Sequence, residues 1–346
     1  MHIAVCTAQV PFVHGGNEVL VEGLAAALRA RGHRVAEVAL PFKWYPRESF
    51  IGSVLAWRLV DITEANGVPV DLAICTKFPS YVVRHPRKVV WLVHQYRQAY
   101  DWFGTPLSDL TSTPDDVGFR RWLASLDRKT LGEARARYAI SRNVAARLKK
   151  FNGLDATPLY PPLRPGFHSG PTGDYVLHLN RLDAAKRVDL LLRAAALLPP
   201  DAGLRYIIAG DGPDRAALEK QAASLGLGER VRFAGRVPDA EAADLYAGAR
   251  AVYYAPVDED YGFSTVEAFA SGVPVVTTDD AGGVLEFVED GVTGFVTPPD
   301  PARVAASLAR VAADPALCER LGAAGRQRVA GINWDGVVDA LLAGAG

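Results

Sequence analysis

Cysteine is scarce in this chain of 346 residues, which contains only Cys6, Cys75 and Cys318 and no Cys-x-x-Cys spacing. That scarcity argues against a disulfide framework or a cysteine-based zinc site and fits a reducing compartment. The N-terminal stretch lacks the basic and apolar regions of a secretory signal. No apolar run reaches the ~18 residues that span a bilayer. We therefore expect a soluble, cytoplasmic protein, with contact at the inner face of a membrane left open.

A G-x-G-x-x-G fingerprint is also missing, because the first half offers only Gly15-Gly16 ahead of a helical pattern. This absence argues against a nicotinamide-dependent dehydrogenase. The two glycines still let backbone N–H groups approach a phosphate or a sugar. A plain turn is the alternative interpretation. The neighbouring His14 is a weaker candidate for the same region.

Charge is distributed unevenly along the chain, although its net value is only −1. Residues 1–165 carry 22 Lys and Arg against 14 Asp and Glu, a net charge of +8. The remaining residues carry 16 against 25, a net charge of −9. The first half should therefore attract anionic partners, unless the solvated faces of the two halves simply differ in sign.

Short β-branched runs alternate with helical patterns, which predicts parallel sheets flanked by helices. Several runs are almost wholly apolar, as strands covered on both faces require. The expected strands are His2–Thr7, Arg34–Ala39, Asp71–Thr76, Lys88–Val93, Arg137–Ile140, Tyr175–Leu179, Arg205–Ala209, Arg230–Phe233, Ala251–Tyr254, Val273–Thr277 and Phe295–Thr297. The first expected helix is Asn17–Arg31, stopped by Gly32.

The alternating pattern starts twice, on either side of the Pro- and Gly-rich stretch 155–174. Such a stretch is typical of a linker. The length also suits two domains of ordinary size. We therefore expect two α/β domains, and a cleft between such domains is a favoured place for a ligand.

The segment 258–274, DEDYGFSTVEAFASGVP, follows an expected strand and so lies where open α/β sheets bind ligands. Gly262 permits close approach of a ligand to the backbone. Ser264 is a suitable N-cap for a helix from Thr265 to about Ser271, ended by Gly272. The positive end of that helix favours phosphate.

The two glutamates of this segment also have non-functional interpretations. Ser264-x-x-Glu267 matches a capping box, in which the glutamate bonds back to the cap. Glu259 lies in an acidic loop and would simply be solvated. The Asp-x-Asp spacing of Asp258 and Asp260 is common, and we do not expect a metal there.

Several motifs together resemble the E-x7-E signature of the group-1 retaining glycosyltransferases of the GT-B fold. The central motif, EDYGFSTVEAFASGVPVV at 259–276, includes the aromatic-Gly pair after the first Glu and the A-x-G-x-P-V tail. The others follow the same order as in the family: Gly15-Gly16-x-Glu18, NRLDAAKR at 180–187, AGDGP at 209–213, FAGRV at 233–237 and GGVLEFVEDGVTGF at 282–295.

The resemblance implies two Rossmann-like domains that face a cleft, an acceptor-binding domain at 1–165 and a nucleotide-sugar domain at 166–330. Residues 331–346 would return to the first domain, with Trp334–Ala343 as a helix. It also implies sugar transfer from a nucleoside-diphosphate sugar to a hydroxyl acceptor, with retention and without a metal or other cofactor. A surface glycan, a lipid-linked glycan and a natural product all remain open as acceptors.

Roles for individual residues follow from the matched motifs. The resemblance implies that Arg181 and Lys186 hold the donor diphosphate, which agrees with their charge. Glu259 would bond the transferred sugar and Glu267 the ribose. The remaining implied donor contacts are Gly15, Gly16, Arg236, Gly262, Phe263, Ser264 and Thr265. Arg181, Lys186 and Arg236 have the alternative of ordinary surface cations.

His94 ends an expected strand, and family members often carry a histidine there that contacts the donor sugar. A structural hydrogen-bonding histidine is the alternative. Two aromatic and basic stretches, 41–50 and 94–104, would form the acceptor pocket, a packed core or a membrane-facing patch, and we favour the pocket or the core over the membrane. The acceptor candidates are Tyr96, Arg97, Tyr100 and Asp101.

Two other classes of function stay open on the same fold. One is a sugar-nucleotide epimerase, which needs no acceptor, or a glycoside phosphorylase, which needs free phosphate. The other is a non-catalytic subunit that binds a sugar nucleotide without turnover. We expect no nucleic-acid partner, and peripheral membrane contact would involve the basic N-terminal half.

Overall fold

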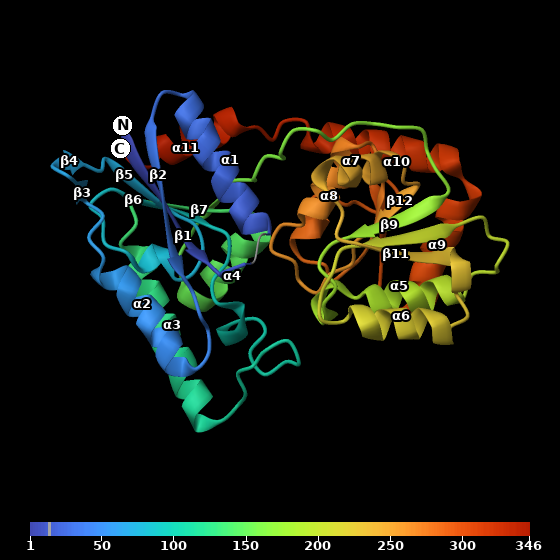
Figure 1. The fold of residues 1–346 in the computed structure, drawn as a ribbon, viewed down its shortest axis with the longest axis horizontal. Coiled ribbons are helices and arrows are strands. Elements are labelled where there is room, and N and C mark those ends of the chain that lie inside the picture. Colours follow the sequence, from blue (N-terminus) through green and yellow to red (C-terminus); the bar gives the residue numbers. More distant parts are fainter. Residues whose placement is uncertain (13–14) are drawn as a thin grey trace. The chain divides into compact units, whose positions relative to one another are not determined.

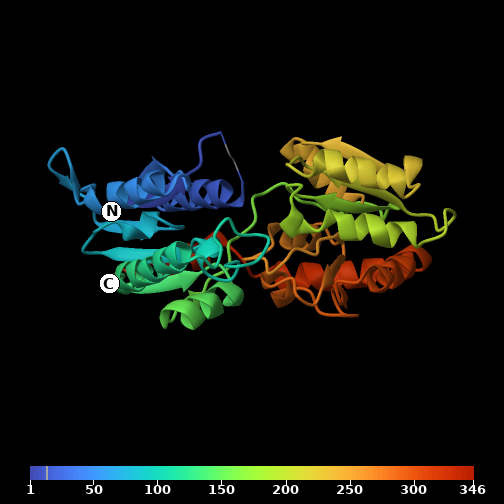
Figure 2. The same cartoon turned by 90° about the horizontal axis from the view of Figure 1, so that it is seen from below.

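The computed structural model describes residues 1–12 and 15–346, and the chain forms two compact units. The first unit comprises Met1–Pro162 together with Ile332–Gly346, and the second comprises Leu163–Gly331. Both chain termini lie in the first unit (Figure 2).

Each unit is built on a six-stranded parallel sheet, which confirms the predicted α/β class. The first sheet has the order β2-β1-β5-β6-β7-β8 and the second has the order β11-β10-β9-β12-β13-β14. The strands of the first unit are β1 (His2–Gln9), β2 (Arg34–Pro41), β5 (Leu72–Cys75), β6 (Lys88–Leu92), β7 (Ala136–Ala139) and β8 (Thr157–Pro158), with a small antiparallel hairpin of β3 (Glu64–Ala65) and β4 (Val68–Pro69). Those of the second are β9 (Tyr175–Leu179), β10 (Arg205–Ala209), β11 (Val231–Gly235), β12 (Ala251–Tyr253), β13 (Val275–Thr278) and β14 (Gly294–Thr297).

Helices cover both faces of each sheet (Figure 1). In the first unit they are α1 (Gly16–Ala30), α2 (Arg47–Leu59), α3 (Pro114–Gly132), α4 (Arg142–Asn152) and α11 (Trp334–Ala343). In the second they are α5 (Val188–Ala196), α6 (Arg215–Ser224), α7 (Asp239–Ala247), α8 (Phe263–Ala270), α9 (Pro301–Ala313) and α10 (Pro315–Val329). Helix α5 packs against α9, and α8 packs against α10.

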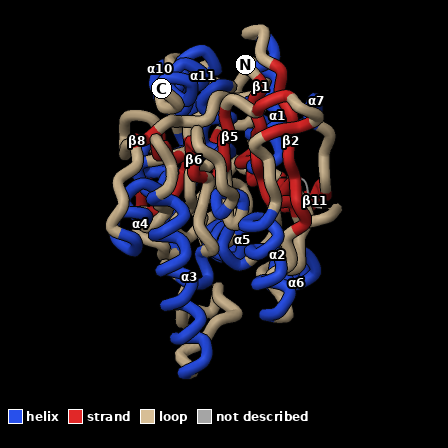
Figure 3. Tube along the Cα trace, turned by 90° about the vertical axis from the view of Figure 1, so that its left-hand side faces the viewer, coloured by secondary structure: helices blue, strands red, loops and turns tan. Residues whose placement is uncertain are grey.

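Coverage on both faces explains the continuous apolar strands that the sequence shows. Every residue of β5 and of β6 is buried, as parallel strands between two helical layers require. Figure 3 shows these strands in red among the surrounding helices of the first unit. The three cysteines are free and buried, so they act as core residues.

The C-terminal helix α11 has the predicted bounds and packs on α1 in the first unit (Figure 1). A side chain at Gly23 of α1 would come within 2.3 Å of the Trp334 ring, so the close contact requires glycine. Tyr138 of β7 donates a hydrogen bond to the carbonyl of Ala340 at 2.7 Å. Arg31 also pairs with Asp335 at 2.8 Å. These contacts fix α11 on the sheet of the first unit.

Candidate functional site

The strand order of the second sheet reverses between β9 and β12, and this switch point is where such a sheet offers a ligand site. From β9 the chain moves to β10 and β11 on one side, and it then returns to β12 on the other side of β9. The loops that follow β9 and β12 therefore diverge, and a crevice opens at the carboxyl ends of these strands. Arg181 and Lys186 lie on the first loop, and Glu259 lies on the second.

Backbone hydrogen bonds join three loops at this edge of the sheet. The amide of Val257 donates to the carbonyl of Ala185 at 2.8 Å and so links the loops after β9 and β12. The amide of Asp258 donates to the carbonyl of Asp280, at 3.0 Å, in the loop after β13. Glu259 bonds the same loop twice, through its amide to Ala281 and through its carbonyl, which accepts from Gly283 at 2.7 Å. The position of Glu259 is therefore set by main-chain atoms.

Lys186 and Glu259 form an ion pair at the centre of this arrangement. Only 15% of the Lys186 side chain and 19% of the Glu259 side chain are exposed. The Lys186 ammonium also donates to the Tyr254 hydroxyl at 3.3 Å. Burial, and then the Glu259 charge, raise the pKa of Tyr254 well above its ordinary value, so this hydroxyl stays protonated. The two predicted residues are thus brought together, with a neutral tyrosine beside them.

Arg181 extends from the loop after β9 and is much more exposed than Lys186. Its side chain is 64% exposed, and its Nε lies 3.6 Å from the carboxylate of Asp183. Burial raises the pKa of Asp183, while Lys186 and Arg181 oppose that shift. Asp183 was not predicted as a site residue, although it lies between Arg181 and Lys186 in the NRLDAAKR motif.

Arg187 is a further residue that the sequence did not single out, although it ends the NRLDAAKR motif. Its guanidinium donates to the carbonyls of Ala255 and Pro256 at 2.8 and 2.7 Å. It also pairs with the carboxylate of Asp280 and donates to Thr278 at 2.9 Å. Its backbone is left-handed, with φ of 50°. Arg187 therefore links the loop of Lys186 to the ends of β12 and β13.

Helix α8 begins two residues earlier than the sequence predicted, so the prediction of Ser264 as its N-cap is wrong. The helix runs over Phe263–Ala270, Gly262 is its N-cap, and no side chain caps it in the described structure. Ser264 lies inside the first turn, where its hydroxyl donates to the carbonyl of Leu179 and accepts from Asn180, both at 3.0 Å. Its bonding groups serve the loop after β9 and not the helix end.

Gly262 and Thr265 shape the start of α8. Gly262 has φ of 91°, and a Cβ there would lie 2.9 Å from Val284, so both the backbone and the space require glycine. The Thr265 hydroxyl is buried and has no hydrogen-bond partner among the described residues. Phe263 is half-buried, and its ring packs edge-on against Tyr261. An uncapped helix start with an unused hydroxyl suits an anionic or hydroxyl-bearing ligand.

Glu267 bonds to a neighbouring helix and not to its own helix start, so the capping-box interpretation is also wrong. Its carboxylate accepts a hydrogen bond from the Tyr246 hydroxyl of α7 at 2.9 Å. Burial raises the pKa of Glu267, while Tyr246 and the charge of Arg164 oppose the rise. Tyr246 was missed because nothing in its local sequence marks it as a partner of Glu267.

Gly15 and Gly16 start α1 in the first unit, at the carboxyl end of β1. Gly15 is the N-cap, and its amide donates to the Glu18 carboxylate at 3.0 Å. Glu18 also pairs with Lys77 at 3.2 Å. Burial works to raise the pKa of Glu18, but Lys77 and Asn17 lower it below its ordinary value. The pair is thus a helix start with a charged support and not a plain turn. His14 lies outside the described residues.

His94 follows β6 at the same edge of the first sheet. It is half-buried, and its Nδ1 lies 2.7 Å from the carbonyl of Gln95, a contact that fixes Nδ1 as a donor. Arg236 follows β11 in the second unit and is exposed.

The acceptor candidates after His94 contribute mainly to the interior of their own loop. Tyr100 is buried, and its hydroxyl donates to the Asp127 carboxylate at 2.6 Å. Arg97 pairs with Asp101 and lies 4.1 Å from the Trp102 ring centroid. These contacts favour the packed-core alternative for this part of the loop.

Tyr96 also packs on aromatic neighbours, at 4.9 Å from the ring of Phe50. The stretch 41–50 is only partly packed, because Phe50 is buried while Tyr45 is 60% exposed.

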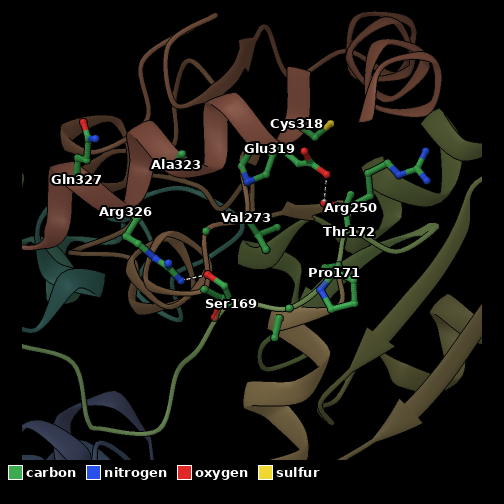
Figure 4. A pocket seen from close by; sticks show the side chains of 16 residues that line it. Ser169, Pro171, Thr172, Arg250, Val273, Cys318, Glu319, Ala323, Arg326 and Gln327 are labelled. Atoms are coloured by element: carbon green, nitrogen blue, oxygen red, sulfur yellow. Dashed lines mark hydrogen bonds between the residues drawn. The ribbon is translucent and has the colours of Figure 1, made fainter. Parts of the chain in front are cut away.

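A pocket of about 390 Å³ lies at the opposite, amino-terminal edge of the second sheet (Figure 4). Val273 leads into β13 here, and Arg250 leads into β12. Arg250 donates to the carbonyl of Gly173 at 2.7 Å, and Arg326 donates to the carbonyl of Ala270. These arginines satisfy backbone groups, so we do not include the pocket in the candidate site.

No group of three or more His, Cys, Asp or Glu is arranged to hold a metal ion within residues 1–12 and 15–346. Over the same residues, no helix is long and apolar enough to cross a membrane.

Known structures share this fold. Sucrose-phosphate synthase from Thermosynechococcus elongatus has a TM-score of 0.78 at 21% identity, and the match covers 100% of both chains. Anabaena HepE, solved in complex with UDP and glucose, has a TM-score of 0.75 at 20% identity, over 99% of this chain and 100% of that one. The chain therefore has the GT-B fold of glycosyltransferases.

The sequence comparisons show similarity to known families over about half of the chain, including the second unit. Residues 164–328 match the family described as "Glycosyl transferases group 1". The D-inositol 3-phosphate glycosyltransferase of Frankia alni is 38% identical over 181 residues, which are 49% of this chain and 44% of that protein. A homologous enzyme of Catenulispora acidiphila is 38% identical over 179 residues, 49% of this chain and 43% of that protein. The chain thus spans less than half the length of these curated relatives, and it resembles the group 1 glycosyltransferases.

Proposed function

We propose that the protein is a glycosyltransferase that moves a sugar from a nucleoside-diphosphate sugar to a hydroxyl acceptor, with retention and without a metal. The observation that carries this proposal is the Lys186–Glu259 ion pair at the switch point of the second sheet, beside the uncapped start of α8. The Lys186 cation suits the diphosphate of such a donor, and the Glu259 carboxylate, bonded to Lys186, suits the sugar next to that diphosphate.

The ligand-free pair rearranges when the donor binds. The diphosphate takes the Lys186 ammonium as a partner, with the exposed Arg181 and the amides of α8 as additional positive groups. Glu259 is then released to accept hydrogen bonds from the sugar hydroxyls. Glu267, held by Tyr246, accepts from the ribose hydroxyls. These contacts concentrate positive charge where the leaving nucleoside diphosphate gains negative charge.

The transfer step then proceeds on one face of the sugar. The bond between the anomeric carbon and the phosphate oxygen breaks, the acceptor oxygen bonds to the same face, and its proton passes to the departing phosphate. Such internal return needs no second carboxylate opposite the leaving group, in contrast to double displacement. The acceptor would bind to the basic N-terminal half of the chain.

The names of similar proteins support a uridine nucleotide and an anionic acceptor as first choices for testing. HepE was solved with UDP and glucose, and the curated relatives are named D-inositol 3-phosphate glycosyltransferases. The net charge of +8 on residues 1–165 is compatible with an anionic acceptor.

A thermal-shift panel of UDP-, GDP-, ADP- and dTDP-sugars tests the donor assignment, because a ligand bound to the native state raises its stability. We expect one nucleotide series to raise Tm and to undergo slow hydrolysis without an acceptor. Conversion to an epimeric sugar nucleotide would point to an epimerase, and turnover that requires free phosphate would point to a phosphorylase. Binding without any turnover would indicate a non-catalytic subunit.

A further inference from the structure

Helix α2 presents an uninterrupted apolar stripe to solvent. Ile51, Leu55 and Leu59 follow each other at four-residue spacing and are 36%, 50% and 79% exposed. Gly52 and Ala56 are exposed between them. One charged residue, Arg58, adjoins the stripe between Ile51 and Leu59, but its side chain is only 18% exposed and pairs with Glu133 at 2.7 Å. The exposed Glu48 lies one turn before Ile51. A solvated helix usually carries more polar residues on its outward side.

The opposite side of α2 already has its partners. Phe50, Val54 and Trp57 are buried against the first unit. The outward leucines are thus not needed for the core, and a helix that is apolar on both sides calls for a second apolar environment.

Aromatic side chains flank the stripe. Trp44 and Tyr45, just before α2, are 36% and 60% exposed, and their rings meet edge-on at 5.2 Å. Trp122 of α3 is 39% exposed and stacks on Phe119. Exposed Trp and Tyr beside aliphatic residues are typical of surfaces that enter the interface of a bilayer.

Helix α3 runs beside α2 and contributes to the same side of the unit. Arg47 pairs with Asp115 at 2.9 Å at the start of the two helices, and Arg58 pairs with Glu133 at 2.7 Å at their ends. Arg47 is shared between Asp115 and Asp116, so the arginines of α2 offset Glu133 and part of the acidic charge at the start of α3.

Lysines without an ion-pair partner among the described residues are present at the same borders. Lys43 precedes the aromatic pair and is exposed, with its ammonium 5.3 Å from the Tyr45 ring centroid. Lys129 is exposed on α3, seven residues from Trp122 and so on the same side of that helix. The first half of the chain as a whole carries the net charge of +8. Cations around an apolar centre fit an anionic lipid headgroup layer.

We propose that this α2 face, formed by Trp44, Tyr45, Ile51, Leu55, Leu59 and Trp122, docks onto an anionic lipid surface. The aliphatic stripe enters the boundary between headgroups and acyl chains, the aromatic rings lie at headgroup level, and Lys43 and Lys129 contact phosphates. A second copy of the chain fits less well, because three aliphatic side chains on one helix offer far less than the ~800 Å² per partner that stable dimers bury. The proposal does not depend on the proposed sugar transfer.

The test is co-sedimentation of the full chain with vesicles of phosphatidylcholine alone and of equimolar phosphatidylcholine and phosphatidylglycerol. We expect binding to the anionic vesicles, weaker binding to the neutral ones, and a decrease with added salt. The double variant Leu55→Ser/Leu59→Ser should lose roughly tenfold or more in partitioning. Leu197→Ser is the matched control, because Leu197 is an equally exposed leucine (59%) in the second unit.

A second pair of variants tests the electrostatic part. Lys43→Gln and Lys129→Gln should each weaken binding to anionic vesicles about fivefold. Lys220→Gln, at an exposed lysine of α6, should have no effect. All variants should keep the Tm of the parent and its shift with the nucleotide donor, so that a failure of lipid binding is distinguished from a failure of the donor site.

Two results would overturn the proposal. One is wild-type protein that stays in the supernatant with anionic vesicles, or a Leu55→Ser/Leu59→Ser variant that sediments like the parent. The other is a vesicle-free dimer, seen by sedimentation velocity, that the same two substitutions dissociate. That outcome would make the α2 face a contact between copies of the chain.

Discussion

The ammonium of Lys186 and the carboxylate of Glu259 are bonded to each other. Lys186 and Glu259 therefore neutralise each other, and the proposed donor binding separates them. The free energy needed to separate the pair lowers the affinity for any phosphate ligand that binds Lys186.

This relationship predicts opposite effects of two substitutions on binding of the free nucleoside diphosphate. Glu259→Gln should tighten that binding several-fold, because Lys186 no longer has a competing carboxylate, while Lys186→Ala should weaken it. Both should lower kcat/KM for transfer by roughly 10²–10³. Calorimetric titration and steady-state rates measure the two effects. Glu289→Gln, at an exposed glutamate paired with Arg328, is the control. Equal weakening by both variants would contradict the competition.

The contacts of Arg187 predict that its substitution lowers activity, although its side chain does not contact the substrate. Arg187→Lys keeps the charge but cannot bond Ala255, Pro256, Thr278 and Asp280 together, because lysine lacks the planar fork. We expect Tm to fall by several degrees and kcat to fall with it, as the loop carrying Lys186 loosens. Arg193→Lys, in the exposed pair with Asp189 on helix α5 that follows Arg187, should change neither quantity. An unchanged kcat in the Arg187→Lys variant would show that Arg187 does not position the loop of Lys186 for catalysis.

The hydrogen bond from Tyr246 to Glu267 predicts that loss of the Tyr246 hydroxyl weakens donor binding in a way that depends on the ribose hydroxyls. Tyr246→Phe removes the hydrogen bond that orients the Glu267 carboxylate, and the donor KM should rise about fivefold at similar kcat. The comparison that isolates the cause uses a 2′-deoxyribose donor, for which parent and variant should differ less. The same loss with both donors would mean that Tyr246 acts through general packing.

The buried Asp127 predicts that stability depends on pH. Burial raises the pKa of Asp127 to about 7, although Tyr100 and Tyr81 oppose the rise. Its unfolded value is about 3.9. The folded protein therefore binds the proton more tightly, so this contribution to stability is fully present below pH 4 and is lost as the pH rises towards 7 and above.

Asp127→Asn should thus be less sensitive to pH than the parent. The difference in unfolding free energy between parent and variant should change by a few kcal/mol from pH 5 to pH 8, in the direction that favours the variant at high pH. Urea unfolding at both pH values measures it. A parallel dependence in the two proteins would show that Asp127 does not titrate in this range.

The proposed charge stabilisation by Lys186, Arg181 and α8 predicts that chelation has no effect. Transfer rates with excess EDTA should equal those without it. A loss that magnesium or manganese restores would assign a metal role to the acidic run at Asp258–Asp260.

The sequence predicted the strands well because buried parallel strands have a simple signature. All eleven expected strands exist, with ends within two residues, whereas β8 lay hidden in the proline-rich stretch assigned as a linker. Motif spacing pointed to Lys186 and Glu259, which the structure brings together. The start of α8 could not be predicted, since Ser264 has the character of an N-cap but instead bonds Leu179 and Asn180 from another loop. Arg187 and Tyr246 were missed for the same reason: their roles depend on partners distant in the sequence.

The bonds that hold Glu259 come from the main chain, and this affects how the site can change. Substituting Asp258 or Ala281 leaves in place the amide and carbonyl that join the loops, but both positions limit the new side chain, because Asp258 has φ of 45° and Ala281 is fully buried. Gly283 is restricted as well, since a Cβ there would come within 2.6 Å of the Asp260 carbonyl. The loops that hold the ion pair therefore tolerate few substitutions.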